Sequence, residues 1–426
     1  MRVALLNNNN NNFFAFARYL RDLGVDAHVF VIDPLPDHFL PPADTFEDSC
    51  SLSYVHYLDG EAMRQWRVTR VIRFFKQLKQ LYVDLASFDI IVACGNLSYF
   101  AIKNIKIDVF MPYGGDIFQL IVQHTLSKRR GLIHLYHRCL ACLQRKAIKN
   151  SRIVMALASI DGNVHQALKK LNKPWLEKAV PMVYPTQIAD VSEQWDFLKD
   201  HDFILFSHTR QSWYQVEDYK GNEKYIKAFA RFVKTECNFH APILVLFEYG
   251  LTILASKELI TSLGIDQYVK WMPKMSRKDI FFGLSKASLA IDALTDKVAS
   301  FGGVVFESFM YAIPTIGTAT ISSAVPANTV LPLVHAFTEQ DVHRILVDYQ
   351  RLPGKYKQIG LVARKWFHDN IGIYHANKCK KLFELLMHNP EVPVDDSDFY
   401  QEILKIWDVN LAETQNLLMD RSKCAE

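Results

Sequence analysis

Residues 299–314 read ASFGGVVFESFMYAIP and carry the strongest signal of fold and function in the chain. Gly302 and Gly303 follow a predicted strand and directly precede an apolar run with helical spacing. Glycine lets a backbone approach a ligand closely, and the unpaired amides at a helix start attract anions. A phosphate held by Gly302, Gly303 and Val304 would lie at the positive end of the helix dipole. Glu307, about one turn further on, would then accept hydrogen bonds from sugar hydroxyls. A tight turn before a core helix with one exposed acid would give the same pattern.

A second polar segment lies earlier in the chain. Residues 206–210 (FSHTR) end a predicted strand with Arg210, and residues 219–222 (YKGN) place Lys220 just before the next predicted helix. Two cations delivered by one strand-to-helix loop suit a diphosphate, which leaves a reaction with growing negative charge. Surface lysines and arginines are also commonly just solvated, so the pair alone leaves both interpretations open.

Around these segments, short β-rich runs alternate with helical patterns, which indicates parallel α/β sheets. The polar residues 186–200 lack a clear period, so we expect the interdomain linker there. The predicted strands before it are 3–6, 27–32, 89–94, 107–112, 152–157 and 179–184, with helices at 13–23 and 162–171 and helical character over 117–150. After it the strands are 203–207, 243–247, 268–272, 289–292 and 315–316, with helices at 222–234, 256–263 and 304–311. A chain of 426 residues is also long enough for two domains.

In order and separation, the two polar segments resemble glycosyltransferase family 4. That family has the GT-B fold, in which two Rossmann-like, doubly wound α/β domains face each other across a cleft. It carries an arginine and a lysine after the first strand of its C-terminal domain, and then a motif commonly written E-x-F-G-x-x-x-x-E-A-x-A-x-G-x-P. The matching residues here are Arg210, Lys220, Phe301, Gly302, Glu307 and Pro314. Ser308, Met310 and Ala312 stand where the family has Ala, Ala and Gly, so the helical half of the motif matches loosely.

The resemblance implies a role for each matching residue. Arg210 and Lys220 would bind the donor diphosphate, Gly302, Gly303 and Val304 would give it backbone amides, and Glu307 would hold the nucleotide ribose. The main departure is Ala299, which stands where the family has its first glutamate. That glutamate contacts hydroxyls of the transferred sugar, so Ala299 leaves open the sugar specificity and the activity itself.

The implied activity is that of a retaining, metal-independent hexosyltransferase. It would move a hexose from a UDP- or GDP-sugar to a hydroxyl of a glycan or lipid-linked acceptor, as in polysaccharide biosynthesis, with no cofactor. Residues 1–187 would form the acceptor-side domain, with helices of 375–426 packing back on it, and residues 200–374 the donor domain. Two alternatives stay open: a sugar-nucleotide epimerase of the same architecture, and a non-catalytic sugar-nucleotide-binding or scaffold protein.

Two N-terminal segments are further candidates. Residues 111–116 (MPYGGD) resemble the family's His-Gly-x-Asp turn beside the reaction centre, with Tyr113 in place of histidine. The resemblance implies a catalytic position for Asp116, although a carboxylate at a predicted helix start also caps well. The run Asn7–Asn12 tolerates positive φ and offers amide donors. Two interpretations of that run stay open. It either contacts an acceptor or phosphate, or it forms a polar, partly disordered loop.

Composition and charge narrow the partners and the compartment. A net charge of +4 does not point to nucleic acid, and seven cysteines without a framework spacing fit free thiols in a reducing compartment. No apolar run approaches the roughly 18–20 residues that span a bilayer. We therefore expect a cytoplasmic protein, peripheral at most on the inner membrane face.

One basic helical segment is the candidate for membrane contact. Cations recur from Arg64 to Lys79, and a predicted apolar face contains Val68, Val71, Phe75, Leu78 and Tyr82. Such a helix either lies on an anionic bilayer or packs on its domain with a solvated basic face. No metal site is expected, because His134, His137, Cys139 and Cys142 do not converge on one face of a helix.

Overall fold

The computed structural model folds into two compact units, each built on a parallel sheet. Unit 1 comprises Met1–Pro41, Glu47–Tyr184 and Asp369–Glu426, and unit 2 comprises Pro42–Phe46 and Pro185–His368. The structure describes residues 1–408 apart from 33–36, 59–67, 114, 118–131, 157–167, 170, 174, 178–182, 187–191, 214–218, 296–302, 319–330 and 395.

The sheet of unit 1 has seven strands in the order β3-β2-β1-β4-β5-β6-β7, and all neighbouring pairs are parallel. The strands are β1 (Arg2–Leu6), β2 (Asp26–Val31), β3 (Val55–Tyr57), β4 (Ile90–Ala93), β5 (Val109–Phe110), β6 (Ile153–Ala156) and β7 (Trp175–Glu177). The inner strands read as continuous apolar runs because helices cover both faces of the sheet.

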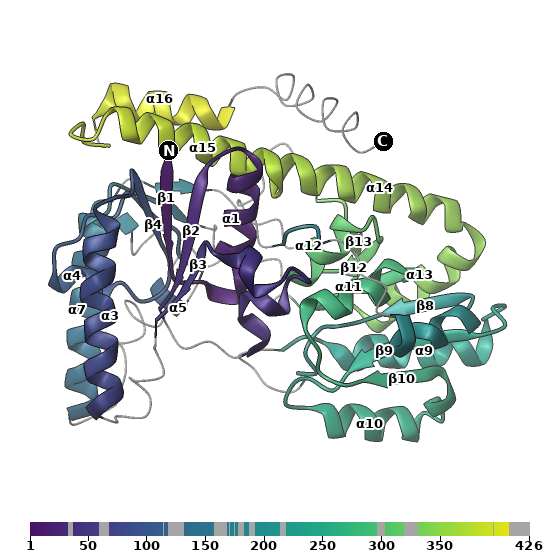
Figure 1. The fold of residues 1–426 in the computed structure, drawn as a ribbon. Coiled ribbons are helices and arrows are strands. Elements are labelled where there is room, and N and C mark those ends of the chain that lie inside the picture. Colours follow the sequence, from purple (N-terminus) through teal and green to yellow (C-terminus); the bar gives the residue numbers. More distant parts are fainter. Residues whose placement is uncertain are drawn as a thin grey trace. The chain divides into compact units, whose positions relative to one another are not determined.

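Two layers of helices cover the sheet of unit 1. One hydrophobic core lies under α1 (Asn12–Asp22), α15 (Ile373–His388) and α16 (Ser397–Asp408), and the other lies under α3 (Val68–Leu85), α4 (Ser98–Ile102) and α7 (Leu132–Asn150). Figure 1 shows these layers on either side of β1, β2 and β4. The short elements are η1 (Asn9–Asn11), η2 (Asp37–Phe39), η4 (Ser49–Leu52) and α5 (Gly115–Ile117), while η3 (Pro41–Ala43) lies where the chain passes to unit 2.

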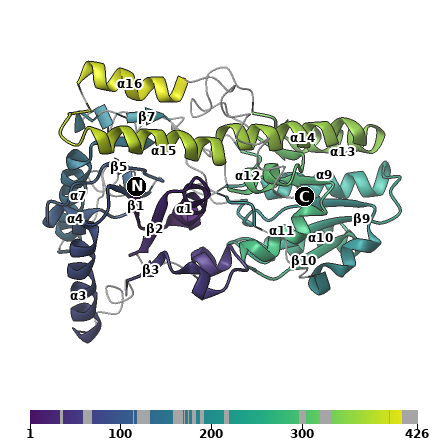
Figure 2. The same ribbon diagram turned by 45° about the horizontal axis from the view of Figure 1, so that its top comes forward.

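The C-terminal helices belong to unit 1 because their apolar faces complete its core. The ring of Phe383 on α15 packs edge-on against Phe16 on α1, with centroids 6.1 Å apart. The buried guanidinium of Arg152 donates to the carbonyls of Leu386 at 2.7 Å and Asn389 at 2.5 Å, so it holds the end of α15. Figure 2 shows α16 beside α15.

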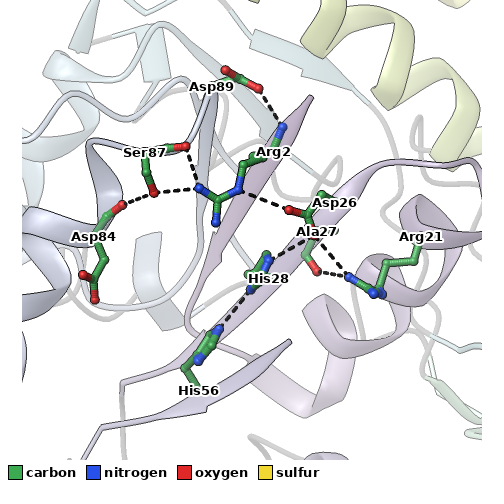
Figure 3. A network of polar contacts seen from close by, with 9 residues as sticks. All are labelled: Arg2, Arg21, Asp26, Ala27, His28, His56, Asp84, Ser87 and Asp89. Carbon is green, nitrogen blue, oxygen red and sulfur yellow. Dashed lines mark hydrogen bonds and ion pairs between the residues drawn. The ribbon is translucent and has the colours of Figure 1, made fainter. Parts of the chain in front are cut away.

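A polar network joins the first strands of unit 1 (Figure 3). The guanidinium of Arg2 lies 3.2 Å from the carboxylate of Asp26 and donates to the hydroxyl of Ser87. The other oxygen of Asp26 lies 3.1 Å from Nε2 of His28, and Nδ1 of His28 lies 3.0 Å from Nε2 of His56. The two imidazole rings are stacked, with an interplanar angle of 8°. Their nitrogens share one hydrogen bond, in which one ring donates and the other accepts.

The sheet of unit 2 has six parallel strands in the order β10-β9-β8-β11-β12-β13. The strands are β8 (Phe203–Phe206), β9 (Pro242–Phe247), β10 (Val269–Met272), β11 (Leu289–Ile291), β12 (Thr315–Gly317) and β13 (Val334–His335). The helices are η6 (Ser192–Asp200), α9 (Asn222–Thr235), α10 (Ile253–Ser262), η7 (Asp266–Tyr268), α11 (Arg277–Ser285), α12 (Gly303–Met310), α13 (Glu339–Arg351) and α14 (Pro353–Asn370). The strand order reverses at β8, which lies between β9 and β11.

The predicted α/β class with two doubly wound sheets is correct, but several elements differ from expectation. Strands β3 and β7 were not predicted. The predicted strand at 179–184 lies mostly outside the described residues, and its described residues Val183 and Tyr184 are not strand. Most of the predicted helix at 162–171 lies outside the described residues.

The predicted linker at 186–200 is wrong in its second half, because Ser192–Asp200 is the packed helix η6. Its Trp195 is 1% exposed, and the ring lies against Gly283 on α11 so closely that an added Cβ there would come within 2.5 Å. Packing of the Trp195 ring holds this segment against unit 2 although most of its other residues are polar.

The predicted apolar face of the basic helix is also wrong in part. Among the side chains of α3 that the structure describes, Phe74, Leu78, Leu81 and Leu85 are buried, whereas Phe75 is 53% exposed. Val68 and Val71 of the predicted face are not among the described side chains. The helix is therefore rotated relative to the expectation from its sequence. None of the helices in the described residues is long and apolar enough to cross a membrane.

Candidate active site

The candidate site of unit 2 is at the carboxyl edge of its sheet, where β8 and β11 end. His208, Thr209 and Arg210 follow β8, and Asp292 follows β11. The hydroxyl of Thr209 lies 3.3 Å from Oδ1 of Asp292 and joins the two strand ends. Because the strand order reverses at β8, this edge is the topological switch point at which open parallel sheets bind ligands.

Glu307 is the centre of a buried ionic network at this edge. One carboxylate oxygen lies 2.6 Å from Nε2 of His208, and the other lies 2.8 Å from Nε of Arg277. Burial by itself would raise the pKa of Glu307, but the charge of Arg277 and the hydrogen bond from His208 lower it below its ordinary value. The lowered pKa favours the ionised carboxylate. Because the side chain is buried, the alternative of one exposed acid on a core helix is wrong.

Arg277 connects Glu307 to a distant part of the sequence. Its Nη1 lies 3.0 Å from a carboxylate oxygen of Asp44, in the segment Pro42–Phe46 that belongs to unit 2. Burial would lower the pKa of Arg277, but Asp44 and Glu307 together raise it. The backbone of Asp44 is held as well, because its carbonyl accepts a hydrogen bond of 2.8 Å from the hydroxyl of Thr186. One guanidinium thus fixes two buried carboxylates, which keeps each charge paired.

The start of α12 lies directly against this network. A Cβ added to Gly303, the first residue of α12, would lie 3.4 Å from the Glu307 carboxylate and 3.9 Å from the Arg277 guanidinium. Gly303 and Val304 are the first two residues of α12, and phosphate binding by their amides stays a prediction. Gly302, like Ala299, lies outside the described residues.

Lys220 reaches the same edge from the loop between β8 and α9. Burial raises the pKa of Asp292, and the nearby charge of Lys220 is the largest influence opposing that rise, followed by lesser contributions that include His208. Gly221 fixes the backbone here with a φ of 70°, and an added Cβ would lie 2.7 Å from the carbonyl oxygen of Leu294. Only glycine suits this close, left-handed position.

Arg210 lies in the same loop, and its side chain is exposed. Its backbone carbonyl accepts a hydrogen bond of 3.2 Å from the amide of Asn222. The structure thus brings Lys220, Asp292, His208, Glu307 and Gly303 together. Contact of both cations with one diphosphate stays a prediction.

Asp116 lies in unit 1, where its carboxylate is engaged by the backbone. It accepts hydrogen bonds from the amide of Tyr113 at 3.0 and 3.1 Å and from the amide of Gly95 at 3.0 Å. The side chain is buried and joins the turns that follow β4 and β5. These hydrogen bonds give Asp116 a structural role that does not require it to take part in a reaction. The catalytic role of Asp116 stays a prediction.

The asparagine run after β1 adopts the backbone that its composition predicts. Asn7, Asn10 and Asn11 have φ values of 72°, 53° and 58°. The side chain of Asn7 donates to the carbonyl of Cys94 at 2.8 Å. Both amide atoms of Asn12 are buried without a hydrogen-bond partner among the described residues. The run is therefore a compact turn rather than a solvated loop.

Sequence reasoning missed His208, Arg277 and Asp44. His208 lies in the FSHTR segment, two residues before Arg210. A histidine so close to a predicted site arginine could have indicated a site residue. Arg277 and Asp44 gave none, because their partners are remote along the chain. Within the described residues, no group of three or more His, Cys, Asp or Glu side chains is arranged to hold a metal ion.

The chain was compared with known protein families, curated proteins and solved structures. No protein-family model matches the chain, and no curated protein matches it. Among solved structures, HepE from Anabaena in complex with UDP-glucose matches with a TM-score of 0.59 and 14% identity, over 90% of this chain and 100% of that one. Sucrose-phosphate synthase from Thermosynechococcus elongatus matches with a TM-score of 0.57 and 12% identity, over 91% and 100%. The fold is GT-B.

A GT-B protein of a different activity also matches. A putative UDP-N-acetylglucosamine 2-epimerase from Listeria monocytogenes has a TM-score of 0.54 and 12% identity, over 92% of this chain and 97% of that one. Because the GT-B fold serves more than one chemistry, the reaction depends on the residues of the site.

Proposed function

We propose that this chain is a nucleotide-sugar-dependent glycosyltransferase with its donor site at the carboxyl edge of the unit 2 sheet. The observation that carries the proposal is the buried, ionised Glu307 beside the start of α12, with Lys220 at the same edge. A helix start and a cation suit a diphosphate, and an ionised carboxylate suits ribose hydroxyls. HepE, which shares the fold, has a solved structure in complex with UDP-glucose.

The proposed reaction transfers a hexose from a UDP- or GDP-sugar to a hydroxyl of a glycan or lipid-linked acceptor. Arg210, Lys220 and the amides of Gly303 and Val304 stabilise the leaving diphosphate, so turnover requires no divalent metal and no cofactor. The acceptor hydroxyl attacks the anomeric carbon on the face from which the diphosphate leaves, so the configuration of the sugar is retained. The departing phosphate takes the acceptor proton, so no dedicated protein base is needed. In this scheme Asp116 shapes the acceptor side by holding two backbone turns.

Turnover of nucleotide sugars tests the proposal. The full chain is incubated with UDP-, GDP- and ADP-sugars and a panel of acceptors, with and without EDTA, and the anomeric configuration of the product is determined by NMR. We expect transfer with retention that EDTA does not reduce. Arg210→Ala and Lys220→Ala should each lower kcat/KM by about 100-fold or more, since each removes a group that stabilises the leaving charge.

The control for these variants is Lys227→Ala, which removes an exposed cation on α9 and should keep full activity. Full activity in both Arg210→Ala and Lys220→Ala would contradict the site assignment. Formation of an epimerised nucleotide sugar without acceptor would favour the epimerase instead. Tight donor binding with no turnover on any acceptor would favour a non-catalytic binding protein.

We also propose that unit 1 binds an anionic membrane surface peripherally through the outer face of α3. Three apolar side chains on this face are exposed: Ile72 by 52%, Phe75 by 53% and Val83 by 65%. The exposed cations Arg73, Lys76 and Lys79 lie among them at helical spacing. Apolar groups interleaved with cations are what an interfacial helix presents to anionic lipid. This surface would bring the chain to a lipid-linked acceptor at the inner membrane face.

Vesicle binding tests the membrane proposal. We expect the full chain to sediment with vesicles that contain phosphatidylglycerol and to stay in solution with pure phosphatidylcholine. The double variant Lys76→Glu and Lys79→Glu should lose binding, since each basic residue near an anionic surface contributes about 1 kcal/mol. Lys357→Glu, an exposed lysine of unit 2, is the matched control. Equal binding by the double variant and the control would exclude α3 as the contact surface.

A further inference from the structure

His208 carries a buried nitrogen that the protein does not use. Its side chain is 4% exposed, and Nε2 lies 2.6 Å from Glu307. Because an ionised carboxylate only accepts hydrogen bonds, Nε2 must carry the hydrogen of this contact. The other ring nitrogen, Nδ1, is buried and has no hydrogen-bond partner anywhere in the described part of the chain. Buried polar atoms in native proteins are nearly always paired, so an unpaired Nδ1 points to a partner that is not part of the protein.

The surroundings of His208 define what that partner is. The ring contacts Glu307, which we assign to the ribose, and lies against Phe206 and Phe247. His208 also stands two residues before Arg210, at the start of the loop that we assign to the diphosphate. The charge of His208 also influences Asp292, so the ring is close to both strand ends of the switch point. The ligand chemistry that fits this place is the ribose-phosphate part of a nucleoside diphosphate.

We propose that His208 binds the nucleoside diphosphate directly through Nδ1, and that Arg277 and Asp44 are positioning residues that hold Glu307 for the same ligand. The inference rests on the proposed function and assigns three residues to it. The Glu307 carboxylate lies beside Gly303, where the phosphates bind, and an unpaired anion there would repel them. Arg277 neutralises that charge and fixes its direction, and Asp44 fixes Arg277 from its other side.

Two isosteric variants separate the two nitrogens of His208. The side-chain amide of asparagine occupies the place of Nδ1, and that of glutamine occupies the place of Nε2. Binding is measured by calorimetry on the full chain, with whichever of UDP, GDP and ADP the wild type binds most tightly. We expect His208→Gln to weaken binding by about tenfold, as for one lost hydrogen bond, and His208→Asn to bind more tightly than His208→Gln.

The relative affinities of the two variants decide whether Nδ1 of His208 contacts the nucleotide. Tighter binding by His208→Gln than by His208→Asn, or equal binding by the two, would overturn the direct contact and leave His208 as a support of Glu307. In either case the proposed function would stand. If the wild type bound none of the three nucleotides, the proposed function and this inference would both fall.

A double-mutant cycle tests the positioning role of Asp44. We expect Asp44→Asn to weaken nucleotide binding about fivefold in the wild-type background and to have little effect in Glu307→Gln, because Asp44 acts through Arg277 on that carboxylate. A purely structural role would weaken binding equally in both backgrounds, and that result would overturn the assignment. Glu258→Gln, which changes an exposed acid on α10, serves as the control in both backgrounds.

Discussion

At the scale of single residues, the site combines groups that local patterns find with groups that they cannot find. Arg210, Lys220 and Glu307 could be singled out because a strand end or a helix start lies beside them in the sequence. The partners of Glu307 could not, since Asp44 and Arg277 are charged residues that look solvated until folding brings them together. Long-range ion pairs leave no periodic trace, so the ionised state of Glu307 became clear only from the structure.

The stacked pair His28 and His56 allows a prediction of pH dependence. Burial, with the charge of His28, lowers the pKa of His56 below its ordinary value, and Asp84 only partly opposes this shift. A depressed folded-state pKa means that the neutral ring is favoured by folding. The stability of unit 1 is then unaffected above the unfolded pKa of about 6.5 and decreases as the pH falls below it.

Thermal unfolding between pH 8 and pH 5.5 measures this effect. In both proteins the unfolding midpoint should decrease as the pH falls. We expect this decrease to be smaller in His56→Gln than in the wild type. His240→Gln, an exposed histidine of unit 2, should follow the wild-type curve. An unchanged slope in His56→Gln would contradict a lowered pKa of His56 in the folded protein.

At the scale of elements, strands were easier to predict than the segments between them. The buried strands of unit 2 read as apolar runs, and β8, β9, β10 and β11 lie within a residue or two of their predicted bounds. Strands of two or three residues, such as β3 and β13, are too short to show a pattern. The helix η6 was mistaken for a linker because only two of its described side chains, Trp195 and Leu198, are buried, which is too few to show a periodic face in a polar sequence.

The contact between Trp195 and Gly283 predicts a position where one methyl group is harmful. Gly283→Ala would place a Cβ about 2.5 Å from the tryptophan ring, so the ring or α11 must shift. We expect a loss of stability of about 1–3 kcal/mol, which is the usual effect of overpacking. Denaturant unfolding measures it. Gly354→Ala is the matched control, because an added Cβ there meets nothing within 4 Å. Equal stabilities of the two variants would mean that η6 does not pack on α11 as described.

At the scale of the whole molecule, two α/β units could be expected from chain length and from the alternation of strands and helices. The path of the chain could not. Residues 42–46 leave the first unit, contribute Asp44 to the second and return, which no change in composition marks. The same detour ties the candidate donor site to a segment from early in the sequence. HepE, a sucrose-phosphate synthase and a putative UDP-N-acetylglucosamine 2-epimerase share this fold, so the chemistry depends on such details of the site.

The most direct test is a crystal structure of the chain with its best-binding nucleoside diphosphate. The account predicts that the diphosphate lies within hydrogen-bond distance of the amides of Gly303 and Val304, with Lys220 and Arg210 closing on it and Nδ1 of His208 in contact with the same molecule. A nucleotide bound away from the start of α12, with Lys220 and Glu307 untouched, would contradict the account.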